Sequence, residues 1–450
     1  MSFELTQEYL NEINDLLEEG KSAEVAEQLS ELHPADIAEI LEELNKDEVI
    51  DITENLNSDL LGEVLVQLDE DSRKDVLDTY TGKEIAEEVV ENLDSDDAAD
   101  LISELSEEKK LEVLSNLEDV EQAKQIANLL THAEDTAGAL MATELVKVNH
   151  NWTVMRCVGE MRRQAEDVEQ VHAVYVVDNN DILLGTLSLK KLLTTSTKTP
   201  IKEVYNNKFQ SVKSTTENEE VARMMQKYDM FVVPVVDEMG RLLGRITLDD
   251  VLDFIKEEAD RDYQLASGLS EDVDSSDTVF NLTRARLPWL LIGLMGGVIA
   301  ASVIGQNEDE LSAIPQLAFF IPLIAAMGGN VGVQSSAIVV QALANQSFSE
   351  NIVKKLTKEL SVGLVNGLIC ALVIFGVSLV IGYSQALALT VSLALLTVII
   401  FASLFGTSVP LILDKYKIDP ALATGPFITT ANDVLGLFIY FGIGKAILGF

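Results

Sequence analysis

Apolar residues in the last third of the chain form five long stretches separated by short polar segments. Each stretch has about 18 residues or more, enough for a helix to cross a hydrocarbon core of about 30 Å. One such stretch could be a helix buried in a soluble core, but five in succession with almost no charge predict five membrane-spanning helices. The stretches cover residues 287–304, 314–343, 360–381, 386–413 and 421–448.

Basic residues around these stretches lie mainly on one side of the predicted membrane. Because cytoplasmic loops carry an excess of Lys and Arg, this side is predicted to be the cytoplasm. We therefore expect a multi-pass protein of the cell membrane, with residues 1–283 in the cytoplasm. Seven of the eight basic residues after residue 280 lie on that side: Arg284, Arg286, Lys354, Lys355, Lys358, Lys415 and Lys417.

Residues 1–130 show the periodicity of short amphipathic helices. In residues 32–44 apolar positions recur at spacings of three and four behind a helix start signal. The same pattern returns 61 residues later in residues 93–105, where Asp97 takes the place of Asp36. Short helices that cannot bury their apolar faces alone predict a helical superhelix.

A second repeat follows, and it has the pattern of strands and helices. The β-branched run 174–178 leads through a turn to a helix start at Ser188, and residues 233–237 lead in the same way to Thr247. This repeat resembles a tandem pair of CBS modules over residues 135–258. The resemblance implies α/β modules that dimerise and bind adenine nucleotides such as ATP.

The two modules differ at the residues that the resemblance assigns to the nucleotide. Thr247 and Asp250 occupy the positions of the hydroxyl and the ribose-binding carboxylate in the second module. In the first module Lys191 stands where the carboxylate would be, which puts a nucleotide there in doubt. A pair that serves only as a dimerisation platform is an alternative.

Charge is concentrated in the first part of the chain. Of 32 basic and 74 acidic residues, only eight of each follow residue 280, so residues 1–280 hold 24 and 66 and carry the whole net charge of −42. Such acidity excludes a nucleic-acid binder, which needs clustered Lys and Arg. The two cysteines, Cys157 and Cys370, lie far apart and indicate a reducing compartment rather than a disulfide framework.

These patterns predict a multidomain membrane protein with five parts. An acidic helical N-domain of superhelical form is followed by the tandem α/β pair, a charged connecting helix and a five-helix transmembrane domain. The connecting helix is stiffer than a Gly/Ser tether and could transmit movement to the membrane, or it could be passive. The expected boundaries are 1–130, 131–200, 201–258, 259–283 and 284–450.

Asp433 is the only acidic residue well inside one of the predicted spans. A carboxylate near the centre of a bilayer costs about 2.5–3.5 kcal/mol on insertion scales, so such residues usually face a pathway in the protein. Oxygen ligands without His or Cys suit hard cations, and Mg²⁺ keeps most of its water. Pro426 is expected to free backbone carbonyls nearby. Further candidate oxygens and close-approach residues are Gly425, Thr429, Thr430, Asn432, Gly328, Gly329, Asn330 and Gln334.

With these residues in place, the whole chain resembles the MgtE family of magnesium channels. The specific elements are Gly-Gly-Asn-x-Gly-x-Gln from Gly328, Pro-x-x-x-Thr-x-x-Asp ending at Asp433, and Arg286-x-Pro-Trp at the first span. The resemblance implies a homodimer with one pore, lined by the second and fifth spans, in which paired Asp433 carboxylates hold hydrated Mg²⁺. No nucleotide-hydrolysis or phosphorylation motif is recognised, so we expect passive flow and no enzyme activity.

The resemblance also implies regulatory Mg²⁺ sites between the acidic cytoplasmic parts. Acidic faces repel one another, and a bound divalent cation reverses that interaction at close range. High cytosolic Mg²⁺ would then close the pore, because the ion binds the closed state better. Arg261 beside Asp262 departs from the expected acidic pattern, and any single acid could simply be solvated. The implied ligands are Asp96, Asp100, Glu219, Asp229, Asp250, Asp253, Glu258, Asp262 and Asp419.

Two other functions compete with this hypothesis. A secondary transporter could use Asp433 as a proton relay and carry a small solute. A membrane-anchored CBS sensor would move nothing, but an anchor does not need a carboxylate inside the membrane.

Overall fold

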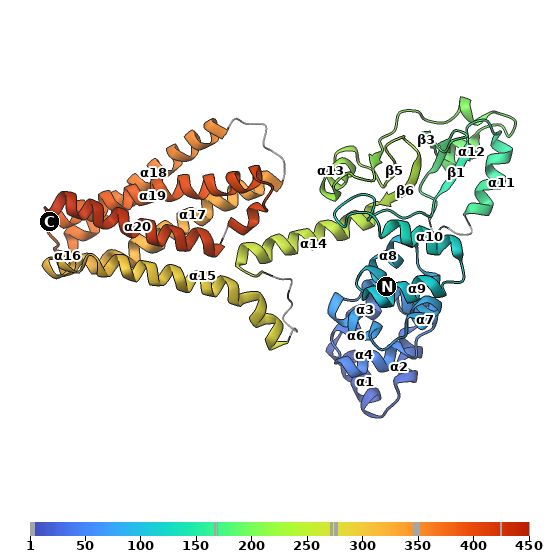
Figure 1. Ribbon diagram of the computed structural model, residues 1–450, viewed down its shortest axis with the longest axis horizontal. Helices are drawn as coiled ribbons and strands as arrows, with labels where there is room; N and C mark the ends of the chain where they lie inside the picture. The colour runs from blue at the N-terminus through green and yellow to red at the C-terminus, as the bar shows by residue number, and fades with distance from the viewer. Residues whose placement is uncertain are drawn as a thin grey trace. The chain divides into compact units, whose positions relative to one another are not determined.

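A computed structural model describes residues 5–165, 168, 170–270, 273, 278–344, 352–423 and 425–449. The chain divides into two compact units, Met1–Ile255 and Lys256–Phe450, and each is considered by itself (Figure 1).

The first unit begins with ten short helices, in agreement with the predicted superhelix. Polar side chains cap most of them; Asn45 and Glu48, for example, form a reciprocal capping box at α4. Packing runs between alternate helices, such as α2 with α4 and α3 with α5. The helices are α1 (Gln7–Glu18), α2 (Ser22–Leu29), α3 (Pro34–Glu42), α4 (Lys46–Thr53), α5 (Ser58–Gln67), α6 (Glu70–Leu77), α7 (Gly82–Glu84), α8 (Ser95–Ser103), α9 (Glu107–Asn116) and α10 (Val120–Leu129), with η1 (Ile85–Val89) and η2 (Val90–Asn92) between α7 and α8.

The sequence repeat in this region corresponds to one structural unit. Helices α3 and α8 begin and end 61 residues apart, at the spacing of the predicted repeat. The match follows from the shared polar start and the shared apolar positions, which bury the same helix face.

Two small three-stranded sheets follow, one in each module of the α/β pair. Each sheet joins its first two strands in parallel and its last two antiparallel. The strands are β1 (Val146–Asn149), β2 (Val174–Val177) and β3 (Leu183–Leu187), then β4 (Val212–Lys213), β5 (Val232–Val236) and β6 (Leu242–Thr247). The helices are α11 (Val154–Gln164), α12 (Leu189–Thr194), η3 (Ile201–Glu203) and α13 (Asn218–Tyr228).

The helical domain and the second module share one hydrophobic core. Val233, Ile246 and Val251 of the second module belong to the same buried cluster as Ile102 of α8. The first module has a separate core that includes Cys157. The apolar face of α8 therefore packs against the second module.

A charged helix, α14 (Leu248–Ser267), continues directly from β6. It includes the first part of the segment 259–283 that was predicted as the connecting helix. Its first turn contains Asp249 and Asp250.

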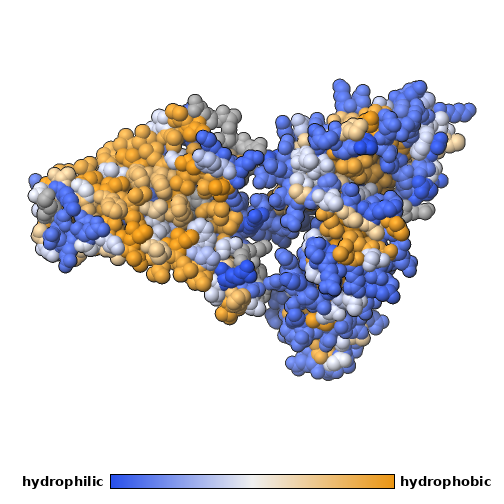
Figure 2. All heavy atoms as spheres, viewed as in Figure 1, coloured by the Kyte–Doolittle hydropathy of each residue, from blue (hydrophilic) through white to orange (hydrophobic). Residues whose placement is uncertain are grey.

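Among its described residues, the second unit contains five helices that are long and apolar enough to cross a membrane. α17, α18 and α20 pack around α19, and α15 packs on α20. Apolar side chains cover the outside of these helices (Figure 2), as expected for contact with lipid. The elements are α15 (Val279–Gly305), α16 (Glu308–Ala313), η4 (Pro315–Phe320), α17 (Ile321–Ala344), α18 (Ile352–Ile381), α19 (Gln385–Lys415), η5 (Pro420–Ala423) and α20 (Gly425–Leu448).

Two details of the spans differ from the expectation. Pro426 lies in the first turn of α20, where its missing N–H would have no partner inside the helix, so it does not break the span. The third spanning helix begins at Ile352 rather than at residue 360. Its first two turns contain polar and charged residues, so hydropathy alone did not include them. Glu359 is therefore part of a spanning helix.

Candidate functional site

Asp433 lies on α20 beside the glycine pair of α17. A methyl group added at Gly329 would lie 3.5 Å from Asp433 Oδ1 and 3.0 Å from Thr429 Cγ2. Thr429 and Asp433 are one helical turn apart and so share a face of α20. The structure thus brings Gly329, Thr429 and Asp433 together, and the missing side chain of Gly329 lets the carboxylate approach the backbone of α17.

The other polar residues of α20 point elsewhere. Thr430 packs its methyl group against Gly296 of α15, where a larger residue would not fit. Asn432 is buried and faces Gly332 of α17, and within the described residues neither its Oδ1 nor its Nδ2 has a hydrogen-bond partner. Thr430 and Asn432 therefore do not join Asp433 in one cluster, because successive residues of a helix point about 100° apart.

Helix α17 has one packed face and one exposed face. Gly328 is buried, and a Cβ there would lie 3.2 Å from Val398 Cγ1 of α19. Asn330 and Gln334, one turn apart, lie on the exposed face. Polar amides on the surface of a membrane helix are unfavourable in contact with lipid, so this face needs a polar or aqueous neighbour.

The start of α20 is joined to the end of α14. Gly425 has a φ of +25°, and a side chain there would overlap the carbonyl oxygen of Ala266. The Thr429 hydroxyl donates to the Gly425 carbonyl oxygen at 3.0 Å. Asp419 Oδ1 accepts from the Ala421 N–H at 2.8 Å and so fixes the turn before α20. Within the second unit, the connecting helix and the helix of Asp433 are thus in direct contact.

A second acidic group lies at the start of α8. One carboxylate oxygen from each of Asp94, Asp96 and Glu144 lies within 4.8 Å of the others. The Ser95 hydroxyl donates to Glu144 Oε2 at 2.9 Å, which holds Glu144 at the helix start. Asp96 Oδ1 is buried without a hydrogen-bond partner in the part of the chain that the structure describes. We call Asp94, Asp96, Asp97, Glu144 and Asp250 the acidic cluster.

Burial and mutual repulsion disfavour the ionised forms in this cluster. Exclusion of water, with the charges of Asp97 and Asp250, raises the pKa of Asp96 well above its usual value. Burial, followed by the charge of Asp250, raises the pKa of Asp97 to about 7. A hard divalent cation would supply the missing positive charge and accept these oxygen ligands.

One buried cation partly balances the acidic cluster. Arg245 Nη2 lies 3.7 Å from Asp94 Oδ2, and its Nη1 donates to the Gln170 carbonyl oxygen at 2.9 Å. The Arg245 side chain is only 7% exposed. A single guanidinium cannot neutralise five carboxylates. The cluster therefore keeps a net negative charge that a divalent cation could balance.

The residues expected to bind regulatory Mg²⁺ are only partly brought together. Asp250 approaches Asp96 and Asp97, and its Oδ2 accepts from the Thr247 N–H and hydroxyl at 2.8 and 2.7 Å. Asp100 is exposed and lies close enough to raise the pKa of Asp97.

The remaining expected ligands are spread over both units. Glu219 Oε2 lies 3.7 Å from Arg223 Nη2, and Asp229 ends α13 in a left-handed conformation with φ +51°. Glu258 Oε2 lies 3.9 Å from Arg261 Nη1. Arg261, the departure noted in the sequence, therefore partly neutralises one of the expected Mg²⁺ ligands. Asp253 is exposed, and Asp262 is partly buried on α14.

Sequence reasoning missed Asp94, Asp97, Glu144 and Arg245. The run Asp94–Asp97 before an apolar helix was a visible signal for the first two. Glu144 and Arg245 gave none, because they are far from α8 in the sequence and meet it only in the folded chain.

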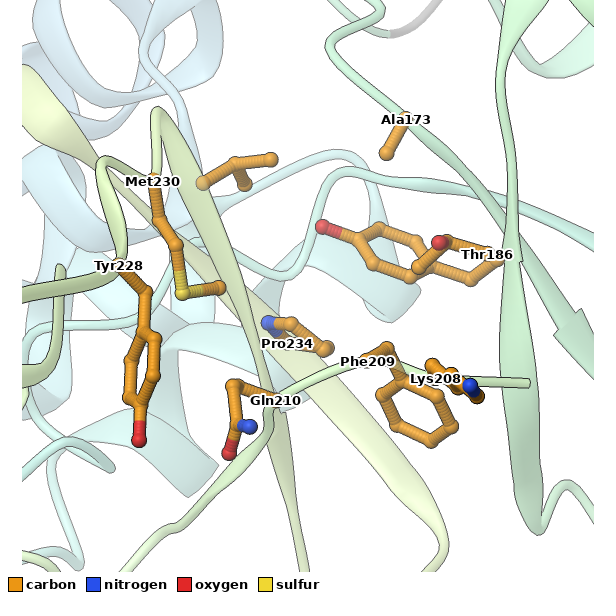
Figure 3. Close-up of a pocket in the computed structure, with 10 residues that line it drawn as sticks. Ala173, Thr186, Lys208, Phe209, Gln210, Tyr228, Met230 and Pro234 are labelled. Carbon is orange, nitrogen blue, oxygen red and sulfur yellow. The ribbon is translucent and has the colours of Figure 1, made fainter. Parts of the chain in front are cut away.

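A cleft of about 430 Å³ opens between the two modules (Figure 3). Tyr228 and Met230 lie on one side of it, and Ala173 and Thr186 on the other. Aromatic rings and one lysine suit a flat ring and an anionic group. The lining residues are Ala173, Tyr175, Thr186, Lys208, Phe209, Gln210, Tyr228, Met230, Val232 and Pro234, and Thr247 and Asp250 are not among them.

Comparison with known families follows the same division of the chain. Residues 32–135 match the MgtE intracellular N domain, residues 137–197 and 201–257 each match the CBS domain, and residues 321–443 match the MgtE divalent cation transporter domain. The chain belongs to the MgtE family of magnesium transporters. The predicted family, and the fold class of helical domain, CBS pair and membrane helices, are confirmed.

Individual MgtE proteins are similar over most of their length. The magnesium transporter MgtE of Thermus thermophilus is 36% identical over 331 residues, 72% of each chain. That of Bacillus subtilis is 33% identical over 328 residues, 73% of each chain. With its five spanning helices, this MgtE-family chain is a multi-pass membrane protein, as predicted.

One solved structure resembles the part outside the membrane. It is the cytosolic domain of the Mg²⁺ channel MgtE in complex with ATP, 34% identical, with a TM-score of 0.51. The match covers 54% of this chain and 99% of the solved one.

Proposed function

We propose that this chain forms a Mg²⁺-selective channel through which Mg²⁺ enters the cell passively. The observation that carries the proposal is the Asp433 carboxylate inside a spanning helix, with Gly329 and Thr429 against it. An acid at this depth is unfavourable unless it serves a pathway. Hydrated Mg²⁺ suits such a site, because it keeps several waters and binds few carboxylates directly.

The pore in this proposal lies between two copies of the chain. Asn330 and Gln334 are exposed on α17, and a second copy would cover that face. Two Asp433 carboxylates across a two-fold axis would then balance the charge of one Mg²⁺ ion. Asn330, Gln334 and Thr429 would hydrogen-bond to its water shell, and Gly328, Gly329 and Gly425 would allow the close approach of the backbones. Thr430 and Asn432 would support the site through packing.

Cytosolic Mg²⁺ closes the channel in this proposal. Residues 1–258 act as the sensor, residues 259–283 as the connection and residues 284–450 as the pore. The acidic cluster binds Mg²⁺ because its partly buried carboxylates lack sufficient countercharge. The contact between Ala266 and Gly425 supports transmission from α14 to α20. Asp100, Glu219, Asp229, Asp253, Glu258, Asp262 and Asp419 serve as further regulatory ligands.

We further propose that ATP binds the CBS pair. The solved relative holds ATP, and the cleft lined by Phe209, Tyr228 and Lys208 has a size typical of small-molecule sites. Thr247 and Asp250 would contribute at the second module only if their mutual hydrogen bonds were exchanged for bonds to the ribose.

Mg²⁺ flux into proteoliposomes tests the central proposal. We expect Asp433→Ala to reduce flux by at least about 100-fold, because the carboxylate that holds the ion is removed. Asp414→Asn, an exposed acid at the end of α19, is the matched control and should leave flux unchanged. Flux that persists in Asp433→Ala would refute the proposal, and flux that requires a pH gradient would favour the proton-coupled transporter.

A further inference from the structure

A second carboxylate in the spanning helices lies away from Asp433. Glu359 Oε1 accepts hydrogen bonds from Ser335 Oγ of α17 at 2.6 Å and from Ser403 Oγ of α19 at 2.8 Å. Ser335 and Ser403 are 4% and 1% exposed. One oxygen atom of α18 therefore joins three spanning helices.

Both serine hydroxyls donate to this one carboxyl oxygen. A carboxylate only accepts hydrogen bonds, and each serine has a single hydroxyl hydrogen to donate. An apolar residue would pack the same helices without the cost of a charge, so packing alone does not account for Glu359.

The helices around Glu359 leave little room for α17 to turn. A Cβ at Gly363, one turn further along α18, would lie 3.1 Å from Ser403 Cβ. At Gly406 of α19 a side chain would overlap the carbonyl oxygen of Gly332, and at Gly332 it would overlap the Asn432 amide. The junction thus lies beside the tightest contacts of α17.

The rotation of α17 decides which of its side chains face the ion path. Ser335 is directed inward by Glu359, and Gln334, the preceding residue, lies on the exposed face with Asn330. Successive residues of a helix are about 100° apart, so a rotation of that size would bring Ser335 to the place of Gln334. Gly329, which lies against Asp433, would move with them.

We propose that Glu359 is a positioning residue that holds α17 in the rotation presenting Asn330 and Gln334 to the ion path. It acts through Ser335 and need not contact the ion. This inference rests on the proposed channel function, because the benefit of a fixed α17 lies in the site that the helix helps to build.

The first test compares Glu359→Ala with Glu359→Gln in Mg²⁺ flux per folded protein, over a range of Mg²⁺ concentrations. We expect Glu359→Ala to lose at least about tenfold in maximal flux, and Glu359→Gln to keep most of it, because the amide oxygen still accepts from both serines. Ser361→Ala, an exposed serine on the same helix, is the control and should not differ from the unchanged chain. Flux within twofold of the unchanged chain in Glu359→Ala would overturn the proposal.

A second measurement does not depend on transport. In a Cys370→Ser background, Gln334→Cys should react with a water-soluble maleimide and Val339→Cys, which is 1% exposed, should not. Adding Glu359→Ala should slow the labelling of Gln334→Cys and speed that of Val339→Cys severalfold. Adding Glu359→Gln should change neither rate. Ser335→Ala replaces Glu359→Ala if the latter does not fold, and it should give the same shift.

The two measurements separate the inference from the function on which it rests. Unchanged labelling in both Glu359→Ala and Ser335→Ala would overturn the positioning role even if flux falls. Absence of flux in the unchanged chain would remove the channel proposal, and the labelling would still decide whether Glu359 fixes α17.

Discussion

Asp96 and Asp97 are partly buried at the start of α8, and exclusion of water raises the pKa of both carboxyls. Asp97 corresponds in the internal repeat to Asp36 of α3. The repeat thus places an acid at both helix starts, and only the one on α8 lies beside the second module. The presence of an acid at the start of α8 was therefore predictable from the sequence. Its raised pKa was not, because it comes from the packing of α8 against the second module.

The raised pKa of Asp97 makes stability depend on pH. A buried acid with a pKa of about 7 binds a proton in the folded state at pH values where the unfolded chain, with a pKa of about 4, has lost it. Without divalent cations, the free energy of unfolding should therefore fall as the pH rises from about 4 to about 7. Thermal unfolding in EDTA at several pH values should show that Asp97→Asn reduces this fall by up to about 4 kcal/mol, or about 1.4 kcal/mol for each pKa unit. Asp36→Asn is the matched control, and an equal slope in all three proteins would contradict the prediction.

Loss of one carboxylate from the acidic cluster should weaken Mg²⁺ binding. Glu144→Gln keeps an oxygen that can accept from Ser95 but removes a charge next to Asp94 and Asp96. We expect the Mg²⁺ concentration that half-protects α8 from hydrogen exchange to rise about tenfold. Glu134→Gln, an exposed acid in the same unit, should leave it unchanged. An unshifted midpoint in Glu144→Gln would exclude Glu144 as a ligand.

At the scale of elements, glycines determine how closely the spanning helices approach. Gly332 of α17 faces both Gly406 of α19 and the Asn432 amide of α20. Three helices therefore meet at a point with no space for a side chain on α17 or α19. Small residues at helix interfaces are the usual means of close packing in membranes. The sequence suggested this use for the glycine-rich segment of α17 but did not identify the partner helices.

Gly332→Ala should therefore destabilise the membrane bundle. The added methyl group would overlap the Asn432 side chain, and we expect a loss of about 1–3 kcal/mol in thermal unfolding in detergent. Gly376→Ala on α18 is the control, because nothing lies within 4 Å of the added atom. A Tm for Gly332→Ala equal to that of Gly376→Ala would show that α17 can shift without cost.

At the scale of the whole molecule, negative charge and apolar surface belong to different parts of the chain. Residues 1–280 carry the net charge of −42, and the five spans carry almost none. This separation suits the proposed function, in which the acidic part senses cations and the membrane part conducts them.

Removal of Mg²⁺ should loosen the acidic part throughout. We expect hydrogen exchange of residues 5–258 to speed up in EDTA, most strongly at α8 and at the start of α14, because unscreened carboxylates repel one another. Ca²⁺ or Mg²⁺ should restore protection and Na⁺ at equal ionic strength should not. Equal protection with and without Mg²⁺ would argue against cation-driven closure.

The sequence by itself determined the five spans, the helical repeat, the tandem modules and the family, because hydropathy and periodicity are properties of neighbouring residues. Tertiary structure alone decided which distant side chains meet. It joined Asp94 and Asp96 to Glu144, separated Asn432 from Asp433, and placed Glu359 between Ser335 and Ser403. Those meetings depend on how helices pack and rotate against one another, and no local pattern in the chain encodes that rotation.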